Sequence, residues 1–243
     1  MKRISIFLIA VALIVGMVGC GLFSTSQNLE IRDWYDLDAV KNNLGSHHRL
    51  MNDLDSTTAG YEELASPTAN EGKGWQPIGT EDDPFTGTFD GQGYEISDLF
   101  INRLDDDFVG LFGIVDEGGR IEDIGVVNAD VTGVEIVGGL VGGNAGTVSN
   151  SYSTGSVTGD ESVGGLVGVN SGTVSDSFWD TETSGQSSSD GGTGKITAEM
   201  KDITTFSGAA WDIIAVANSG ERNPTYIWNI VDNETYPFLS WQP

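Results

Sequence analysis

The sequence of 243 residues has few basic side chains, two histidines and a single cysteine. Its 11 lysines and arginines face 36 aspartates and glutamates, so the formal net charge is −25. Binding to a polyphosphate backbone, or to an anionic membrane by charge, requires clustered Lys and Arg. The composition therefore excludes nucleic acid as a partner. Because one cysteine cannot close an intramolecular disulfide, packing and hydrogen bonds must hold the fold together.

Only one long apolar run is present, at residues 4–18, between a basic pair at 2–3 and Cys20. The run is shorter than the ~20 residues that a membrane-spanning helix needs. The pattern therefore predicts a cleaved export signal over residues 1–19. The position of Cys20 directly after Met-Val-Gly resembles the lipobox of bacterial lipoproteins, which implies that Cys20 becomes the acylated first residue. We expect an exported protein held at a membrane of the cell envelope or surface through Cys20. The alternative is an ordinary signal that ends near a cysteine.

Part of the abundant glycine, 34 residues in all, belongs to an internal repeat. Residues 137–159 read VGGLVGGNAGTVSNSYSTGSVTG and residues 163–185 read VGGLVGVNSGTVSDSFWDTETSG, with 12 identities in the first 15 positions. Weaker copies begin at Val109 and Thr88. Short β-branched runs broken by Gly, Asn and Ser at this period predict a β-helix with one coil per repeat and aligned side chains in columns. Leu111, Leu140 and Leu166 are expected to form one such buried column.

Three strings within these repeats, GLFG at 110–113, GLVGGNAGTV at 139–148 and GLVGVNSGTV at 165–174, resemble GLUG repeats. The resemblance implies a right-handed parallel β-helix of the kind found in surface and secreted bacterial or archaeal proteins. These include filamentous-haemagglutinin-like adhesins and non-catalytic regions of some immunoglobulin-A peptidases. The resemblance brings with it no catalytic signature.

We therefore predict an all-β chain: a short right-handed parallel β-helix with a small N-terminal helical cap and an α+β C-terminal cap. The expected organisation is a signal peptide at 1–19, a tether at 20–30, the cap and first strands at 31–80, the coils at 81–185, and a linker and C-terminal cap at 186–243. Residues 33–44 indicate an amphipathic helix, with Asp33 as its N-cap and Leu37, Val40 and Leu44 on one face. In the C-terminal cap, Trp211, Trp228 and Trp241 are expected to form a core, with a sugar-stacking platform as the alternative.

A row of carboxylates emerges when the four copies are aligned on Phe89, Phe112, Val141 and Val167, which lie 23, 29 and 26 residues apart. Counting back six residues from each aligned position gives an acidic side chain every time: Asp83, Asp106, Glu135 and Glu161. Equivalent positions of a solenoid stack at ~4.8 Å, and Ca²⁺ accepts six to eight oxygen ligands. One hypothesis is therefore a Ca²⁺ ladder at this corner. The alternative is a set of solvated turn carboxylates.

Two other pairs of polar residues indicate structural roles and not ligand or metal binding. Asn144 and Asn170 occupy the same position after the GLVG string, where stacked amides can hydrogen-bond along the solenoid axis. His47 and His48 are adjacent, so on a strand they would point to opposite faces and could not share a metal. We expect a structural asparagine ladder and a surface histidine pair.

The leading interpretation is a non-enzymatic, lipid-anchored β-helix for surface display, adhesion, or binding of an extracellular glycan or protein. The sequence leaves two alternatives open. One is a β-helix polysaccharide lyase or hydrolase, for which only Arg103 and Arg120 supply cations in the coil region. The other is a structural spacer. Apart from Ca²⁺, no cofactor is indicated.

Overall fold

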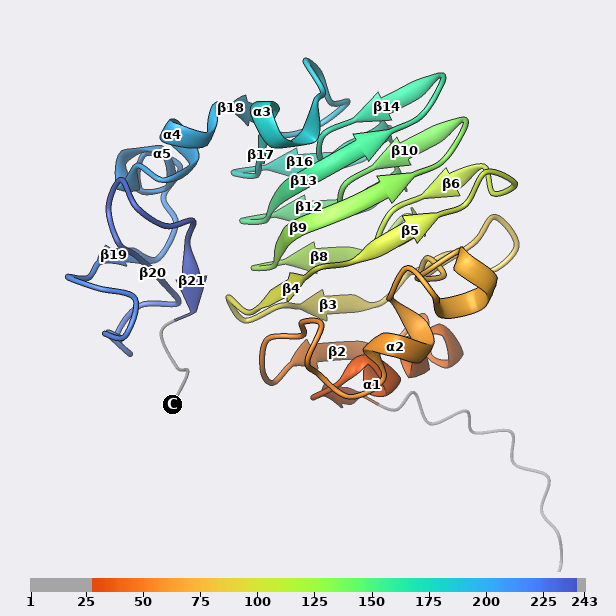
Figure 1. The fold of residues 1–243 in the computed structure, drawn as a ribbon, viewed down its shortest axis with the longest axis horizontal. Coiled ribbons are helices and arrows are strands. Elements are labelled where there is room, and N and C mark those ends of the chain that lie inside the picture. The colour runs from red at the N-terminus through yellow and green to blue at the C-terminus, as the bar shows by residue number, and fades with distance from the viewer. Residues whose placement is uncertain (1–27, 240–243) are drawn as a thin grey trace, which may run out of the picture.

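Short parallel strands stack coil upon coil into a β-solenoid (Figure 1). The structure, a computed structural model, describes residues 28–239. Each full coil contributes one strand to each of four parallel sheets, as the coil that runs from Ile136 to Thr158 illustrates. Its strands are β10 (Ile136–Gly138), β11 (Val141–Asn144), β12 (Thr147–Ser149) and β13 (Tyr152–Thr158). The next coil repeats this order with a spacing of 26 residues, because Ile136 pairs with Ser162 and Val141 with Val167.

Two larger sheets follow each other within a coil, as β12 and β13 do, and two three-stranded sheets complete each coil. The first large sheet has the order β1 (Leu29–Ile31), β2 (His47–Leu50), β3 (Thr88–Asp90), β8 (Arg120–Glu122), β12 and β16 (Thr173–Ser175). The second has the order β18 (Thr193–Lys195), β17 (Phe178–Asp180), β13, β9 (Gly125–Thr132) and β4 (Glu95–Ser97), with β5 (Phe100–Asn102) also paired to β9. One small sheet has the order β14 (Ser162–Gly164), β10 and β6 (Phe108–Val109). The other has the order β15 (Val167–Asn170), β11 and β7 (Phe112–Val115).

The interior of the coils is filled by apolar side chains in register, as a solenoid requires. Leu111, Leu140 and Leu166 are fully buried, and the backbones of successive coils are hydrogen-bonded at Leu140 and Leu166. This confirms the predicted column. The N-terminal cap also agrees with the prediction in its main features. Asp33 accepts a hydrogen bond from the Asp36 amide at 2.9 Å, and the helix that follows buries its apolar face completely.

The cap is shorter in its α-helical part than residues 33–44 suggested. It consists of α1 (Trp34–Ala39) followed by the 3₁₀ helix η1 (Val40–Asn42), and then α2 (Tyr61–Leu64) and η2 (Ala69–Gly72) after β2. Trp34 and Trp75 pack against each other, with ring centroids 5.8 Å apart, beneath the first coils.

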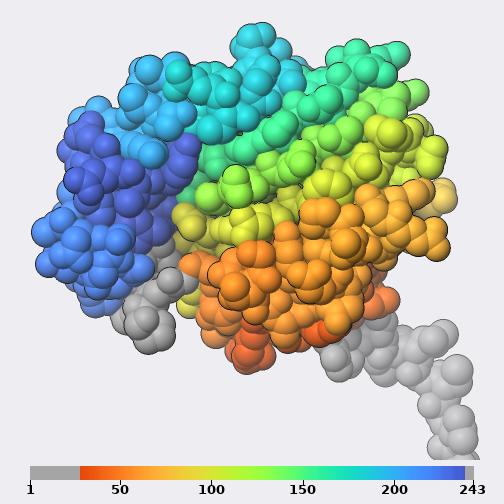
Figure 2. All heavy atoms as spheres, viewed as in Figure 1, coloured from red at the N-terminus to blue at the C-terminus, as the bar shows by residue number. Residues whose placement is uncertain are grey.

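The C-terminal unit, residues 196–239, lies along one flank of the solenoid and not across its end (Figures 1 and 2). It contains α4 (Thr197–Met200), α5 (Ile203–Gly208), β19 (Ile213–Ala215), β20 (Trp228–Ile230) and β21 (Phe238–Leu239). Its own apolar cluster packs on the outer side of the coils against Tyr152 of β13 and Phe178 of β17. The Trp211 indole donates a hydrogen bond to the Asp176 carbonyl at 2.7 Å.

The solenoid extends beyond the predicted range of 81–185 in both directions. Strand β1 already pairs with β2, and β2 pairs with β3. At the other end, the Ser/Gly-rich segment 186–194, expected to be a linker, continues the stacking after α3 (Thr181–Ser184). The Asp190 amide donates to the Val167 carbonyl at 3.0 Å, and β18 pairs with β17. This segment therefore covers the edge of β15, because its polar side chains and backbone supply the missing hydrogen-bond partners.

Candidate functional site

The outward face of the first large sheet carries two rows of polar side chains in register. One row runs through the first residues of the paired strands: His47, Thr88, Arg120, Thr147 and Thr173. The other row comprises Glu30, Arg49, Asp90, Glu122, Ser149 and Ser175, of which Ser149 is buried. Neighbouring side chains of one row stand about 4.8 Å apart, the strand spacing. The face thus changes from charged residues near β1 to hydroxyl residues near β16.

A groove of about 720 Å³ follows the charged half of this face. The groove is lined by cationic and acidic side chains together. The basic side chains are Arg32, Arg49 and the exposed His47, and the carboxylates are Glu30, Asp36, Asp90 and Glu122. The remaining lining residues are Asn28, Leu29, His48 and Thr88. Arg32 pairs with Glu30, and Arg120, just outside the groove, pairs with Glu122 at 2.6 Å. Arg49 is exposed and has no ion pair within residues 28–239.

Burial raises the pKa of the Asp90 carboxyl, and the neighbouring Glu122 carboxylate adds to the effect while the Arg49 guanidinium opposes it. His47 is exposed on the groove, whereas His48 points inward and is buried. Its Nε2 lies 2.9 Å from the Asn43 carbonyl oxygen, and burial lowers the pKa of His48. The expectation of a surface histidine pair is therefore wrong for His48, although the two rings do point to opposite faces.

The four carboxylates of the predicted ladder do not stack. Phe89 pairs with Ile121 of β8, whereas the residue opposite Phe112 in the preceding coil is Ile78. Asp83, counted from Phe89, therefore lies in a different part of the coil, where its amide donates to the Thr80 hydroxyl at 3.1 Å. Phe89 lies on β3 of the first large sheet, whereas Phe112 lies on β7 of a small sheet. The sequence alignment of these two residues is therefore wrong for this weakest copy.

Asp106 is displaced from the ladder by one residue. Phe108 pairs with Ile136, but Phe112 pairs with Val141, because the segment between these positions has one more glycine in the later coil. Asp107, not Asp106, therefore stacks with Glu135 and Glu161: the Asp107 carbonyl accepts from the Ile136 amide, and the Glu135 carbonyl from the Ser162 amide. A one-residue gap in the alignment would have found this register.

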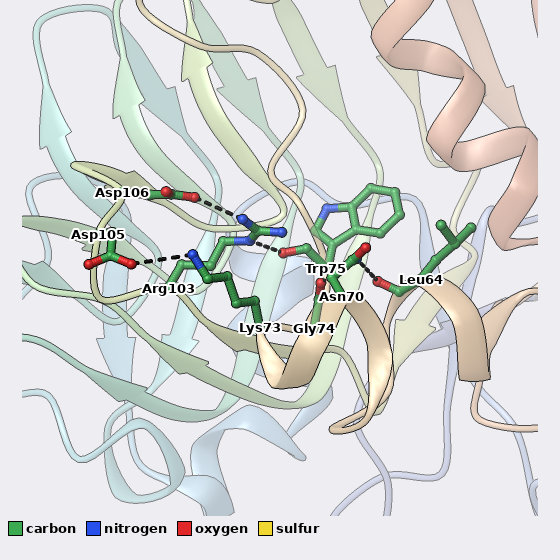
Figure 3. Close-up of polar contacts among 8 residues, drawn as sticks. All are labelled: Leu64, Asn70, Lys73, Gly74, Trp75, Arg103, Asp105 and Asp106. Atoms are coloured by element: carbon green, nitrogen blue, oxygen red, sulfur yellow. Dashed lines mark hydrogen bonds and ion pairs between the residues drawn. The ribbon is translucent and has the colours of Figure 1, made fainter.

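Figure 3 shows what holds Asp106 instead. Arg103 donates one hydrogen bond from Nη1 to Asp106 at 3.0 Å and another from Nε to the Trp75 carbonyl at 2.7 Å. Beside this pair, Lys73 forms an ion pair with Asp105 at 3.3 Å. Arg103 is only 8% exposed, so it ties the acidic loop to the N-terminal cap and does not face a groove. Within residues 28–239, no three His, Cys, Asp or Glu side chains are arranged to hold a metal ion.

Asn144 and Asn170 lie side by side, as stacking predicts. The Asn144 Nδ2 donates to the Asn170 Oδ1 at 2.7 Å, and the Asn144 Oδ1 accepts from the Gly146 amide at 3.2 Å. The equivalent position of the preceding coil is Val115, so the amide ladder has two members. Asn144 is buried, which indicates a structural role for this pair.

Other predicted residues fall in the C-terminal unit or outside the described range. Trp211 and Trp228 are 5% and 1% exposed and pack together with centroids 4.9 Å apart, so they belong to a core and offer no sugar platform. Trp241, Cys20 and the signal peptide lie outside the described residues. Among the helices at residues 28–239, none is long and apolar enough to span a bilayer.

Sequence reasoning missed a group of carboxyls under the C-terminal unit, because no repeat places them together. Burial raises the pKa of Asp53 and Asp123 to about 6 and of Glu95 to about 7. Nearby, the fully buried Asp180 accepts hydrogen bonds from the Thr197 and Tyr236 hydroxyls, both at 2.7 Å. These residues come from different coils, and Asp53 and Glu95 are neighbours because the Glu95 amide donates to Asp53 Oδ1.

Comparison with known proteins identifies the repeat. Residues 133–158 match the model of the GLUG motif, which confirms the resemblance for the copy at 139–148. The chain is 38% identical over 120 residues to a Gly-rich membrane protein of Evansella cellulosilytica, a match that covers 47% of this chain and 13% of that protein. It is 37% identical over 133 residues to halomucin of Haloquadratum walsbyi, covering 52% of this chain and 1% of halomucin. The chain thus matches only a small part of each relative.

Among solved structures, an immunoglobulin A1 protease from Bacteroides ovatus is similar, with a TM-score of 0.43 and 14% identity. The superposition covers 90% of this chain and 94% of that one.

Proposed function

We propose that the chain is an exported, non-enzymatic β-solenoid, anchored to a membrane of the cell envelope through acylated Cys20, that binds an extracellular glycan or protein. The observation that carries this proposal is the groove on the first large sheet. It offers donors from two arginines beside carboxylate acceptors, a combination that suits sugar hydroxyls or a polar protein surface. The names of the relatives, a membrane protein and halomucin, support a location at the cell surface or envelope.

A binding screen of residues 21–243 against glycans and extracellular-matrix proteins, with and without Ca²⁺, tests the binding function. For any ligand found, Arg49→Ala is expected to weaken binding at least tenfold, because Arg49 lines the groove without an ion pair within the described range. Lys73→Ala is the control, since it removes a half-exposed cation that pairs with Asp105, and neither residue lines the groove. Equal losses in both variants would place the ligand elsewhere.

The same screen separates the alternatives left by the sequence. Cleavage of an acidic polysaccharide by the protein would favour the lyase or hydrolase. Failure to bind any glycan or protein, with the fold intact by circular dichroism, would favour the spacer. The two arginines considered for an enzyme are both engaged in pairs, Arg103 with Asp106 and Arg120 with Glu122, which supports binding over catalysis.

The anchor has its own test, independent of any ligand. In cells fed an alkyne-labelled fatty acid, the full chain is expected to carry the label and to sediment with membranes. Cys20→Ser is expected to lose both properties, because Cys20 is the one thiol in the sequence. Labelling that survives in Cys20→Ser, or an unlabelled wild-type chain, would contradict lipid attachment at this residue.

A further inference from the structure

The C-terminal unit meets the solenoid at Tyr152, the first residue of β13. The phenol is fully buried and lies among the rings of Trp211, Trp228 and Tyr236. Its hydroxyl oxygen lies 2.6 Å from Glu95 Oε1, on the solenoid strand β4, and 2.7 Å from the carbonyl oxygen of Pro237, next to β21. Both distances are short enough for strong hydrogen bonds between oxygen atoms.

A tyrosine hydroxyl has one proton to donate, and both of its neighbours here are acceptors when Glu95 is ionised. The two contacts can be hydrogen bonds at the same time only if Glu95 carries a proton of its own. The carboxylic acid then donates to the Tyr152 oxygen, and the Tyr152 hydroxyl donates to Pro237. If Glu95 loses its proton, the phenol turns to the carboxylate because a bond to a charged acceptor is stronger. The buried Pro237 carbonyl then loses its donor.

The groups around Glu95 make this proton exchange accessible near neutral pH. The Glu95 amide donates to Asp53 Oδ1 at 2.9 Å, so a second carboxylate lies beside the first. Burial raises the pKa of Glu95 to about 7 and the charge of Asp53 adds to the rise, whereas the hydrogen bond from Tyr152 and the charge of Arg222 oppose it. Arg222 also stacks its guanidinium on the Phe238 ring at 4.5 Å. Tyr236, on the far side of Tyr152, is held by Asp180.

We propose that Glu95, Tyr152 and the Pro237 carbonyl form a proton-operated latch that fastens the end of the C-terminal unit, β21, to the solenoid and opens when Glu95 ionises. The rest of the unit stays docked, because the bonds from Trp211 to Asp176 and from Tyr236 to Asp180 involve no group that the latch uses. The latch thus couples the position of one short strand to the acidity of the surroundings. It does not depend on what the groove binds.

Hydrogen exchange of the full chain, followed by mass spectrometry at pH 5.5 and pH 8.5 and corrected for the intrinsic exchange rate, tests the latch. In the wild type, peptides covering residues 228–239 are expected to lose protection at least tenfold at the higher pH, while those covering β9 keep theirs. Glu95→Gln keeps a donor toward Tyr152 but cannot ionise, so its protection is expected to stay high at both pH values.

Two further variants complete the test. Tyr152→Phe removes the bridging hydroxyl and is expected to exchange rapidly in residues 228–239 at both pH values. Glu234→Gln changes an exposed glutamate of the same unit and is expected to behave as the wild type. A pH-independent wild type, or a Glu95→Gln protein with the pH dependence of the wild type, would overturn the proposal. If Tyr152→Phe does not fold, the comparison of Glu95→Gln with the wild type still decides.

Discussion

The side-chain amide of Asn144 stabilises the solenoid through a hydrogen bond to the next coil. Its donor satisfies Asn170 of the next coil, and its acceptor satisfies the Gly146 amide two residues on. Both functions depend on the amide's having a donor at one end and an acceptor at the other. A buried polar group that loses its hydrogen-bond partner destabilises the fold by its full desolvation penalty. A neutral amide suits this interior position because it satisfies partners at both ends.

Asn144→Ala is therefore expected to lower the free energy of unfolding by about 1–3 kcal/mol, because it leaves the Gly146 amide without its side-chain acceptor and Asn170 without its donor. Urea denaturation followed by circular dichroism measures the change. Ser219→Ala, at an exposed position of the C-terminal unit, serves as the control and should change stability by less than about 0.5 kcal/mol. Equal stabilities of Asn144→Ala and the wild type would show that the ladder contributes nothing.

The turn between β10 and β11, and its copy between β14 and β15, shows what the repeated glycines do at the scale of an element. A Cβ added to Gly164 would lie 1.9 Å from the Val167 carbonyl oxygen, and one added to Gly138 would lie 2.0 Å from that of Val141. The turn is so tight that backbone occupies the space of a side chain. The extra glycine of this turn, absent from the coil that contains Phe112, also accounts for the shift that separates Asp106 from Glu135.

Gly164→Ala is expected to destabilise the protein by about 1–3 kcal/mol or more, because the overlap is with backbone, which cannot rotate away. Gly208→Ala provides the contrast: Gly208 ends α5, and nothing lies within 4 Å of an added Cβ. There alanine should be neutral or stabilise by up to about 1 kcal/mol. Thermal unfolding of both variants measures the difference, and a Gly164→Ala protein as stable as Gly208→Ala would contradict this account of the turn.

At the scale of the whole molecule, the acidic composition and the raised carboxyl pKa values both lower the stability of the fold as the pH rises. Asp53, Asp123 and Glu95 have pKa values of about 6, 6 and 7, above the ordinary values of such groups. Between pH 4.5 and 7 these three groups therefore make the folded protein bind more protons than the unfolded chain, so their stabilising effect is lost as the pH rises. The lowered pKa of the single buried His48 acts in the opposite direction in this window, and the three carboxyls together outweigh it. The lowered pKa values of Asp55 and Asp202 affect stability only at more acidic pH.

The free energy of unfolding is thus expected to decrease from pH 4.5 to pH 7 and to level off above it. Asp123→Asn should reduce the slope, because it removes one of the three titrations, whereas Asp160→Asn, at an exposed turn, should leave the slope unchanged. Urea denaturation at constant ionic strength over this pH range provides the measurement. A stability that rises through the same window would show that ionised, paired carboxylates dominate instead.

The strong local pattern of the two best repeat copies was enough to predict the solenoid, the leucine column and the position of Asn144 beside Asn170. Stacking at a fixed period makes residues 26 apart into neighbours, so identity between copies already specifies contacts. The N-cap at Asp33 was predictable for a similar reason, since capping depends on residues three positions apart.

Where the repeat weakens, the sequence no longer determined the register. Phe89 and Phe112 resemble each other, yet they lie in different columns, because the coil length changes from one turn to the next and the pairing of whole strands decides the alignment. The groove around Arg49 and the carboxyls of Asp53, Glu95 and Asp123 were likewise decided by tertiary structure alone. They join residues from several coils and from a C-terminal unit that folds back along the flank, and such contacts between distant segments have no periodic signal in the chain.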